Sequence, residues 1–488
     1  MSLESNFKKI DGLSLEATTS FTFFKAIGSL SVIEELKEKL TVHNRSVGYR
    51  IMKLAEQKIF WEPRSFFSEE AALKLSKILS EINKLEPLKV VTYYYEVEGS
   101  IYIPAGFWWL GDIIGDCHLN KDVPLVQLNG LRDYQIEGLQ EQFKYKRATV
   151  VMATGLGKTI MIASTCISMA EAGKRTMVVV PSDYLVGQIE ATIKRYSNSV
   201  SGVSSKRKIK LGQDILVTTA GTATKHVDVY DAVIIDESHH SPASTWRNLL
   251  EDCDNVEYVY NYTATPKRED GMTLGIHAFG GPTVYKRDAA WGIENGWLCD
   301  FDVYCRLIKS YDSKGYEIQV SEKALRTTGN KKCVGNAYFL SVVAKDIISS
   351  IEKGRKVLVL GTSLEPLRML KKILKGRVDF SVADANYKKP LTDFYKNETS
   401  ILVATSKLVS EGIDLPVLDV LFLLTNHSSE TMTYQSLGRI LRKAEGKPKP
   451  LVIDCVAESY KPFIGSFEKR LKIWETLSDN IKTIKNER

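Results

Sequence analysis

The stretch of sequence that decides the fold is RATVVMATGLGKTIMIASTCISMAEAG, residues 147–173. Its apolar run at 149–152 has the length and the valine content of a buried parallel strand. Residues 158–172 have the length and composition of a crossover helix, which ends at a glycine. Between the two, Gly155 and Gly157 permit the tight turn that joins a strand to the next helix. We therefore predict a strand–loop–helix unit of a parallel α/β sheet.

The loop itself, MATGLGKT at residues 152–159, has the residue types of a phosphate-binding loop. Met152 stands where the strict pattern has its first glycine, but the two glycines still let backbone N–H groups turn toward a phosphate. Lys158 could then reach the β- and γ-phosphates of ATP, and Thr159 could bind Mg²⁺. The alternative is a plain strand-to-helix turn, and the coincidence of glycine, lysine and hydroxyl at one junction argues against it.

A pair of adjacent carboxylates follows a second apolar run, in DAVIIDESHH at residues 231–240. Asp236 and Glu237 at the end of a buried strand are costly without a cation. Asp236 is predicted to hold Mg²⁺ through water, and Glu237 to orient and deprotonate an attacking water. The alternative is a solvated pair at a strand end. His239 and His240 are typical of structural histidines, although His239 is a candidate for coupling hydrolysis to movement.

Strand-like apolar runs recur along the chain in two sets. The first set lies at residues 149–152, 177–180, 214–218, 232–235 and 258–262, and the second at 357–362, 401–406, 420–425 and 452–456. The part before residue 127 differs, with helical patterns at 32–40, 46–58 and 69–85 and a predicted hairpin at 89–103. We predict an α/β protein with an N-terminal α+β domain at 1–126 and two parallel-sheet domains at 127–308 and 309–488.

Composition narrows the class of protein. The chain has 488 residues, 26% charged and 44% hydrophobic, which indicates a globular protein with room for about three domains. No apolar run approaches the roughly 20 residues of a membrane span, and the start lacks the apolar segment of a signal peptide, so we expect a cytoplasmic protein. Seven scattered cysteines without a C-x-x-C pair argue against a disulfide framework and against structural zinc. A net charge of +7 permits a polyanionic partner without requiring one.

Further motifs follow in a fixed order from residue 131 to residue 442. They read LRDYQ at 131–135, VVVPSDYLVGQ at 178–188, LVTTAG at 216–221, TATP at 263–266, LGTS at 360–363, VATSKLVSEGIDLP at 403–416 and QSLGRILR at 435–442. With the phosphate loop and the carboxylate pair, this series resembles the superfamily 2 helicases and translocases over roughly two-thirds of the chain. Each motif alone could be an ordinary turn or helix face, but their joint order makes that interpretation improbable.

The resemblance implies two RecA-like motor domains and a role for each matching residue. It implies that nucleotide contacts come from Gln135, Thr154, Gly155, Gly157, Lys158, Thr159, Gly412, Asp414 and Gln435. It implies nucleic-acid backbone contacts from Ser182, Thr219, Thr362 and Thr405, and coupling of hydrolysis to movement through His239, Thr263 and Thr265. Arg439 and Arg442 would act as arginine fingers on the γ-phosphate from the second motor domain. Hydrolysis would then require closure of the two domains, which is how a motor works.

Within superfamily 2, the motifs look most like the phage UvsW-type branch-migration helicases and their RecG-like and XPB-like relatives. DESH in place of DEAD favours DNA over RNA. We expect a monomeric ATP-dependent DNA helicase or translocase that acts 3′ to 5′ on forked and four-way DNA in replication, recombination and repair, in the host cytoplasm if a phage encodes it. We expect the N-terminal domain at 1–126 to recognise the substrate and to set the preference for branched DNA. The alternatives are an RNA helicase or remodeller, the motor subunit of a restriction or repair nuclease, and a nucleotide-binding module without motor activity.

Four further segments are candidates for contacts with nucleic acid. Basic clusters lie at 206–210 and 469–472, and each could equally be a solvated face. The aromatic group at 107–109 is a candidate strand-separating wedge, with core packing as the alternative. The insert at 308–334 is a second wedge candidate, with a surface loop as the alternative.

Overall fold

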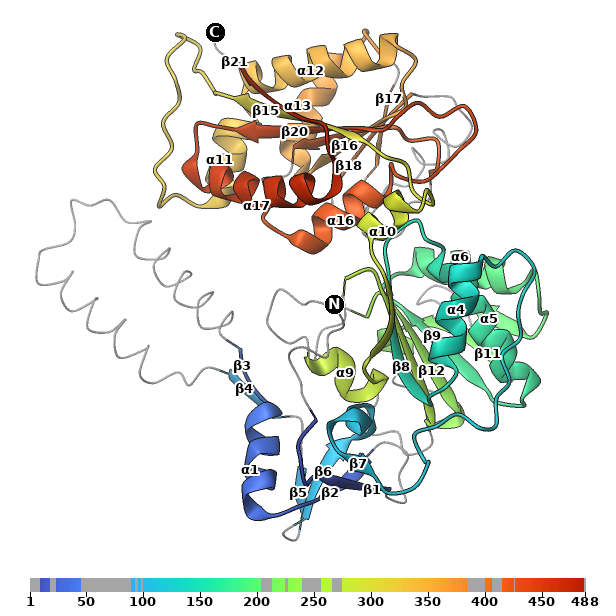
Figure 1. Ribbon diagram of the computed structural model, residues 1–488. Helices are drawn as coiled ribbons and strands as arrows, with labels where there is room; N and C mark the ends of the chain where they lie inside the picture. The colour runs from blue at the N-terminus through green and yellow to red at the C-terminus, as the bar shows by residue number, and fades with distance from the viewer. Residues whose placement is uncertain are drawn as a thin grey trace, which may run out of the picture. The chain divides into compact units, whose positions relative to one another are not determined.

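The chain forms two compact units, each built on a seven-stranded sheet (Figure 1). The first unit comprises Met1–Met152 and Gly157–Lys286, and the second comprises Ala153–Leu156 and Arg287–Arg488. The computed structural model describes residues 9–17, 23–44, 89–92, 95–97, 100–202, 213–223, 227–238, 256–265, 274–378, 380–383, 400–405, 415–424 and 426–486.

The sheet of the first unit has the strand order β10-β11-β9-β12-β13-β8-β14. Its strands are β8 (Arg147–Met152), β9 (Thr176–Val180), β10 (Val200–Gly202), β11 (Ile215–Thr219), β12 (Ala232–Asp236), β13 (Tyr258–Thr263) and β14 (Thr283–Arg287). Strands β8 to β13 pair in parallel. The five predicted apolar runs are therefore confirmed as strands. The sequence pattern missed the edge strands β10 and β14, because an edge strand is short or partly polar and lacks the continuous apolar run of a central one.

Helices flank this sheet, with α4, α5 and α6 on one face (Figure 1). The helical elements are α4 (Asp133–Gln142), α5 (Lys158–Glu171), α6 (Asp183–Ile193), α7 (Ala220–Ala223), η4 (Val227–Val229) and α9 (Leu274–Gly280). Helix α5 is the predicted crossover helix, and its residues 161–169 are buried without a break. Its apolar sequence therefore reflects burial on all sides between the sheet and its neighbouring helices.

The N-terminal part adds a second, smaller sheet to the first unit. This sheet has the order β5-β6-β2-β1-β7, and a separate pair joins β3 to β4. The elements are β1 (Ser14–Ala17), β2 (Phe23–Ile27), α1 (Leu30–Lys39), β3 (Thr41–Asn44), β4 (Lys89–Thr92), β5 (Tyr95–Val97), β6 (Ser100–Pro104), η3 (Ala105–Leu110) and β7 (Asp112–Ile113). The predicted hairpin is present as β5 and β6, with Val97 opposite Ser100, whereas β4 pairs with β3 instead. The predicted helix at 32–40 is α1, and those at 46–58 and 69–85 lie outside the described residues.

The small sheet shares a hydrophobic core with the first motor sheet. Buried residues from η3 and β1, such as Phe107 and Leu15, belong to the same cluster as Met177 of β9 and Ala278 of α9. The contact is close, because a Cβ atom added to Gly106 would lie 2.2 Å from the carbonyl oxygen of His277. The N-terminal part therefore packs as a layer of the first unit.

The sheet of the second unit has the order β17-β18-β16-β19-β20-β15-β21, and its strands pair in parallel. They are β15 (Asp302–Ile308), β16 (Val357–Gly361), β17 (Phe380–Ala383), β18 (Ile401–Thr405), β19 (Val420–Leu424), β20 (Leu451–Ala457) and β21 (Ile481–Asn486). The four predicted runs are β16, β18, β19 and β20. Strand β15 pairs with β20 and β21, although residue 308 was the predicted end of the first motor domain. The second sheet therefore begins at Asp302, because β15 alternates partly exposed with buried residues and lacks a continuous apolar run.

Helices α12 and α13 cover one face of this sheet and α17 covers the other (Figure 1). The helical elements are α10 (Ala289–Glu294), α11 (Arg326–Gly329), η6 (Asn330–Val334), α12 (Ala337–Glu352), α13 (Leu364–Leu374), α16 (Glu430–Gly438) and α17 (Lys461–Leu477). The insert at 308–334 ends in the core, where Cys333 and Val334 are fully buried, so this end is not a surface loop. Among the described residues, no helix is both long and apolar enough to span a membrane.

Candidate nucleotide site

The phosphate loop has the backbone that its glycines predict. Gly155 and Gly157 have φ angles of 94° and 85°, in the left-handed region that residues with side chains rarely adopt. Gly157 is the N-cap of α5, so the first helical residue is Lys158. The Lys158 ammonium donates a 3.3 Å hydrogen bond to the carbonyl oxygen of Met152, at the end of β8. The lysine therefore folds back over the loop toward the edge of the sheet.

Sheet register explains why residues far apart in sequence meet at this edge. Strand β13 lies between β8 and β12, with Val151 level with Thr263 and Tyr262 level with Asp236. Because all three strands are parallel, their carboxyl ends come together where α5 begins. The Lys158 ammonium reaches the carboxylate of Glu237 at 3.3 Å, and the two side chains are only 10% and 13% exposed.

The two carboxylates of this site are buried and close together. Burial, followed by the negative charge of Glu237, raises the pKa of Asp236 to about 7, although Lys158 acts in the opposite direction. The backbone N–H of Glu237 donates a 3.0 Å hydrogen bond to the Asp236 carboxylate. Glu237 has a φ of 50°, the only positive φ of a non-glycine residue in the described part of the chain. Strained backbone of this kind is typical of functional sites, where surrounding structure holds a side chain in a required direction.

Gln135 packs against the phosphate loop from α4. It is 2% exposed, and its side-chain carbonyl accepts a 2.9 Å hydrogen bond from the backbone N–H of Arg132. Its amide nitrogen donates to the carbonyl oxygen of Gly157 at 3.5 Å. A Cβ atom on Gly157 would lie 2.4 Å from this nitrogen, so a side chain at residue 157 would displace the Gln135 amide. The structure therefore brings Gln135, Gly157, Lys158, Asp236 and Glu237 into one cluster.

Three further predicted residues, Thr263, Thr265 and Thr159, lie in the first unit, at or just after the end of β13 and at the start of α5. The Thr263 hydroxyl donates to the carbonyl of Thr265 at 2.8 Å and accepts from its N–H at 3.2 Å, which closes a buried turn at the end of β13. Thr159 lies in the first turn of α5 and is partly exposed. The Thr154 hydroxyl is buried and has no hydrogen-bond partner among the described residues. A ligand oxygen would satisfy that hydroxyl.

The four residues predicted to contact a nucleic-acid backbone lie at the carboxyl ends of strands. In the first unit Thr219 ends β11, and Ser182 is the N-cap of α6 just after the neighbouring β9. In the second unit Thr362 follows β16, and Thr405 ends the neighbouring β18. All four are at least partly exposed.

The predicted arginine fingers lie just beyond helix α16 of the second unit. This helix contains the buried Gln435 and ends at Gly438, so Arg439 and Arg442 do not lie on a solvated helix face. Arg439 and Ile440 form a turn after the helix, and Arg442 then forms an isolated antiparallel bridge with Leu298. The Cys299 N–H donates to the carbonyl of Leu441 at 2.8 Å, which extends the same pairing.

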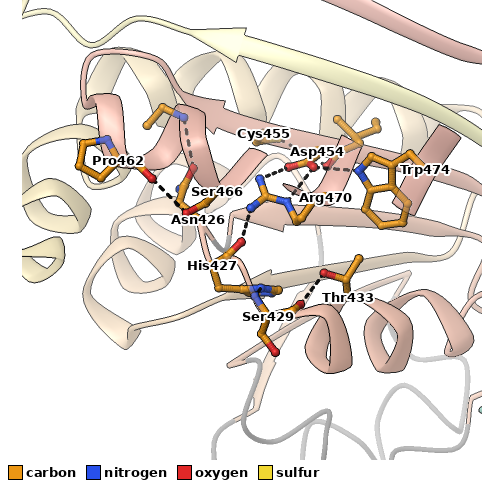
Figure 2. Close-up of polar contacts among 12 residues, drawn as sticks. Asn426, His427, Ser429, Thr433, Asp454, Cys455, Pro462, Ser466, Arg470 and Trp474 are labelled. Atoms are coloured by element: carbon orange, nitrogen blue, oxygen red, sulfur yellow. Dashed lines mark hydrogen bonds and ion pairs between the residues drawn. The ribbon is translucent and has the colours of Figure 1, made fainter. Parts of the chain in front are cut away.

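A buried polar network supports the other end of α16 (Figure 2). The Arg470 guanidinium of α17 donates two hydrogen bonds, of 2.9 and 2.8 Å, to the carboxylate of Asp454 in β20. A third Arg470 nitrogen donates to the carbonyl oxygen of His427 at 2.5 Å. The Trp474 indole N–H also donates to Asp454, at 3.1 Å. One strand, one helix and the loop before α16 therefore converge on one ion pair, whose side chains are 1% and 0% exposed.

The chain then runs from His427 into the cap of α16. Burial, followed by the charge of Arg470, lowers the pKa of His427 to about 4, so its ring is neutral at physiological pH. The neutral ring accepts a 3.2 Å hydrogen bond from the N–H of Ser429, and the Ser429 hydroxyl caps the helix by accepting from the N–H of Met432. The sequence motifs do not predict this network, although an aspartate inside an apolar strand indicates a buried partner.

Two predicted nucleic-acid contacts are corrected by this geometry. Arg470 cannot belong to a basic surface cluster at 469–472, because it is buried against Asp454. The aromatic group at 107–109 is not an exposed wedge, because Phe107 is fully buried and Trp108 stacks on Tyr145 with ring centroids 4.5 Å apart. The remaining expectations for His239, Gly412, Asp414 and the basic cluster at 206–210 lie outside the described residues.

Two models of known protein families match the chain, one in each of the two units. The family model described as "Type III restriction enzyme, res subunit" matches residues 129–268, and "Helicase conserved C-terminal domain" matches residues 341–444. Together they cover half of the chain, with one model on each sheet. The chain belongs to the superfamily 2 helicases. Membership implies an ATP-binding, ATP-dependent nucleic-acid helicase with two RecA-like domains.

Individual relatives of this superfamily 2 helicase are distant. Probable helicase D10 of Escherichia phage T5 is 23% identical over 62% of this chain, and the match spans 66% of the phage protein's own length. DNA 3'-5' translocase XPB2 of Sulfurisphaera tokodaii is 25% identical over 70% of this chain and 84% of its own length. Among solved structures, a fragment of a putative HsdR subunit of a type I restriction enzyme from Vibrio vulnificus has a TM-score of 0.56, with 17% identity, over 86% of this chain and 83% of that one. These likenesses support the fold.

Proposed function

We propose that this helicase acts on DNA and hydrolyses ATP at the cluster formed by Lys158, Asp236 and Glu237. The observation that carries the proposal is the buried Lys158–Glu237 ion pair at the carboxyl edge of a parallel sheet, beside a left-handed glycine loop at the start of α5. A ligand phosphate at this loop would meet backbone N–H groups and the lysine together. Gln135, packed on the same loop, would contact the base, and Thr154 and Gly155 would line the phosphate site.

The ion pair suggests how nucleotide binding prepares the base. Glu237 is the anionic partner of Lys158 in the structure. A triphosphate offers Lys158 a more strongly charged partner, which would free the Glu237 carboxylate to orient and deprotonate the attacking water. The strained backbone of Glu237 would hold that carboxylate in place.

The residues present also fit a magnesium ion. The Asp236 carboxylate is 6% exposed, and burial, followed by the charge of Glu237, raises its pKa, so a bound cation would stabilise its ionised form. Asp236 and the Thr159 hydroxyl are hard oxygen ligands, which Mg²⁺ prefers. The ion would neutralise charge on the phosphate oxygens.

The second unit would supply the charge that hydrolysis needs at the γ-phosphate. Arg439 and Arg442 follow α16. The buried Gln435 of this helix, together with Gly412 and Asp414, would complete the nucleotide contacts. Because the arginines and Lys158 belong to different units, hydrolysis would depend on both, with Thr263, Thr265 and His239 coupling it to movement. Arg442→Ala should lower kcat by roughly 10³–10⁵-fold with little change in ATP affinity.

Exposed hydroxyls and cations support a nucleic-acid path along the strand ends. Ser182 and Thr219 in the first unit, and Thr362 and Thr405 in the second, could donate to phosphates without reading bases. Helix α13 begins just after Thr362 and has an exposed row of cations at i, i+3 and i+4 spacing, which would attract a polyanion. These are Arg368, Lys371, Lys372 and Lys375.

For the substrate we favour forked or four-way DNA, with 3′ to 5′ movement by a monomer in replication, recombination and repair. The resemblance to branch-migration helicases and the similarity to a DNA 3'-5' translocase support this choice. The motor subunit of a restriction nuclease is the second candidate, because the family model that matches residues 129–268 is described as a subunit of a restriction enzyme. An RNA helicase is the third.

One experiment separates these candidates. ATP hydrolysis would be measured with single-stranded, duplex, forked and four-way DNA and with RNA, at matched ionic strength, and Glu237→Gln would serve as the inactive control. We expect the strongest stimulation by branched DNA. Stimulation by RNA alone would reject the DNA assignment, and equal stimulation by duplex and branched DNA would favour a duplex-tracking motor of the restriction type.

A further inference from the structure

Lys447 occupies an unusual position in the second unit, because its ammonium donates hydrogen bonds to three backbone carbonyl oxygens. The distances are 2.8 Å to Pro416, 2.7 Å to Ile440 and 2.6 Å to Arg442. An ammonium has three N–H donors, so its hydrogen-bonding capacity is filled. None of these three partners is a carboxylate, and the lysine is partly buried.

The three carbonyls belong to the two motifs that the second unit is predicted to bring to the nucleotide. Ile440 and Arg442 lie in QSLGRILR, and Pro416 ends VATSKLVSEGIDLP. Lys447 therefore ties the segment that follows α16 to the segment that precedes β19. Gly446, with a φ of 68°, turns the chain so that Lys447 can reach back to both.

The arginine segment is held from its other side by backbone pairing. Arg442 bridges to Leu298, and the N–H of Cys299 donates to the carbonyl of Leu441 at 2.8 Å. The carbonyl of Arg442 accepts from Lys447 and also from the Cys299 thiol, at 3.7 Å, while the carbonyl of Leu441 accepts from the Cys299 N–H. The Ile440–Arg442 backbone is therefore held by Lys447 and by the Leu298–Cys299 segment together.

The charged surroundings of Lys447 do not explain its burial. The titratable and charged groups that act on it are Cys299, Asp419 and Arg442. Asp419 is already engaged, because its carboxylate accepts a 2.8 Å hydrogen bond from Arg355. Partial burial of a cation that has no carboxylate partner is unfavourable in free energy. A hydrophobic side chain of similar size would be buried at a smaller free-energy cost. The arrangement is better explained by what the ammonium holds in place.

We propose that Lys447 is a positioning residue for ATP hydrolysis, which holds the Ile440–Arg442 backbone so that Arg442 is aimed at the nucleotide. The proposal rests on the proposed function of Arg442 as an arginine finger. A finger misplaced by about 1 Å can cost on the order of 10²-fold in rate, because the charge it stabilises exists only in the transition state. Lys447 touches no reacting atom and would act only through Arg442.

The test measures DNA-stimulated ATP hydrolysis of the full chain carrying Lys447→Met, Lys447→Arg or the matched control Lys443→Met, an exposed lysine of the same segment. We expect Lys447→Met to lower kcat about tenfold or more with the ATP KM unchanged within about twofold, and Lys443→Met to match the original protein. Lys447→Arg should restore part of the rate. Equal kcat for Lys447→Met and Lys443→Met would overturn the proposal.

A double-mutant comparison with Arg442→Ala identifies the route of the effect. If Lys447 acts through Arg442, adding Lys447→Met to Arg442→Ala should cause no further loss of kcat. Full additivity of the two losses would overturn the proposal. An Arg442→Ala variant with unchanged kcat would instead reject the arginine-finger function itself, so the two failures are distinguishable.

The dependence of kcat on pH provides a measurement that loss of stability alone would not change. It can be made on the original protein and on Lys447→Arg even if Lys447→Met does not fold. Burial lowers the pKa of Lys447 to about 8, so above that pH the neutral amine retains only two N–H donors for three carbonyls. We expect kcat to fall as pH rises through about 8, and this fall to move to higher pH in Lys447→Arg. If kcat fell at the same pH in Lys447→Arg as in the original protein, the proposal would be overturned.

Discussion

The Lys158 ammonium lies 3.3 Å from the Glu237 carboxylate, so the first residue of α5 and the residue after β12 form one buried pair. The two residues are distant in sequence and become neighbours because β8, β13 and β12 end at the same edge of the sheet. The pair joins the proposed phosphate-binding lysine to the proposed base.

Substitution of each partner should produce a different failure. Lys158→Ala should abolish ATP turnover and weaken ATP binding, because the phosphates lose their lysine contact. Glu237→Gln should retain ATP binding and block hydrolysis, because an amide cannot accept the proton of the attacking water. Nucleotide titration and steady-state hydrolysis measure the two effects separately. A Glu237→Gln protein that hydrolysed ATP at the original rate would refute the role of Glu237 as base.

The raised pKa of Asp236 predicts how stability depends on pH without Mg²⁺. The carboxyl titrates near pH 7 in the folded chain and near pH 4 when unfolded, so between these values the folded state binds more protons. The free energy of unfolding should therefore fall as pH rises from about 4 to about 7. Asp236→Asn should remove this component and be the more stable protein at pH 7. The two proteins would be compared by thermal unfolding across that range, and parallel curves would contradict the prediction.

The buried ion pair below α16 should be important for stability. Arg470→Met leaves the Asp454 carboxylate buried without its main partner, a change that typically costs about 3–5 kcal/mol. The matched control is Lys469→Met on the exposed face of α17, which should change stability by less than about 0.5 kcal/mol. Denaturant unfolding measures both. If Arg470→Met lowered the salt-sensitive affinity for DNA without loss of stability, Arg470 would be a surface contact after all.

The shared core predicts that the N-terminal part stabilises the first motor sheet. Phe107→Ala should destabilise the first unit by about 3–5 kcal/mol, because the ring is fully buried in a cluster with residues of β9 and α9. A chain that begins at Asp122 would expose that cluster, so we expect it to aggregate instead of retaining single-strand-stimulated ATP hydrolysis. A soluble and active truncated protein would show that the motor folds without this layer. The contribution of the N-terminal part to junction preference is better tested by substitutions on its exposed side chains.

The sequence alone determined the parts whose chemistry is local. A phosphate loop needs glycine, lysine and hydroxyl at fixed short spacing, so the sequence predicts one at residues 152–159. A buried central strand needs a continuous apolar run, so the strands within residues 147–173 and 231–240 could be predicted correctly. The same reasoning placed most central strands of both sheets and the residues that line their carboxyl edges.

Tertiary structure decided what depends on contacts between distant segments. The assignment of β15 to the second sheet follows from its pairing with β20 and β21, and the burial of Phe107 follows from its packing against a neighbouring sheet. The hydrogen bonds of Arg470 and Lys447 are made to partners in other segments of the chain. A charged residue in a polar stretch has the sequence pattern of a solvated one, because only the folded chain shows whether water, a carboxylate or a carbonyl oxygen is its partner.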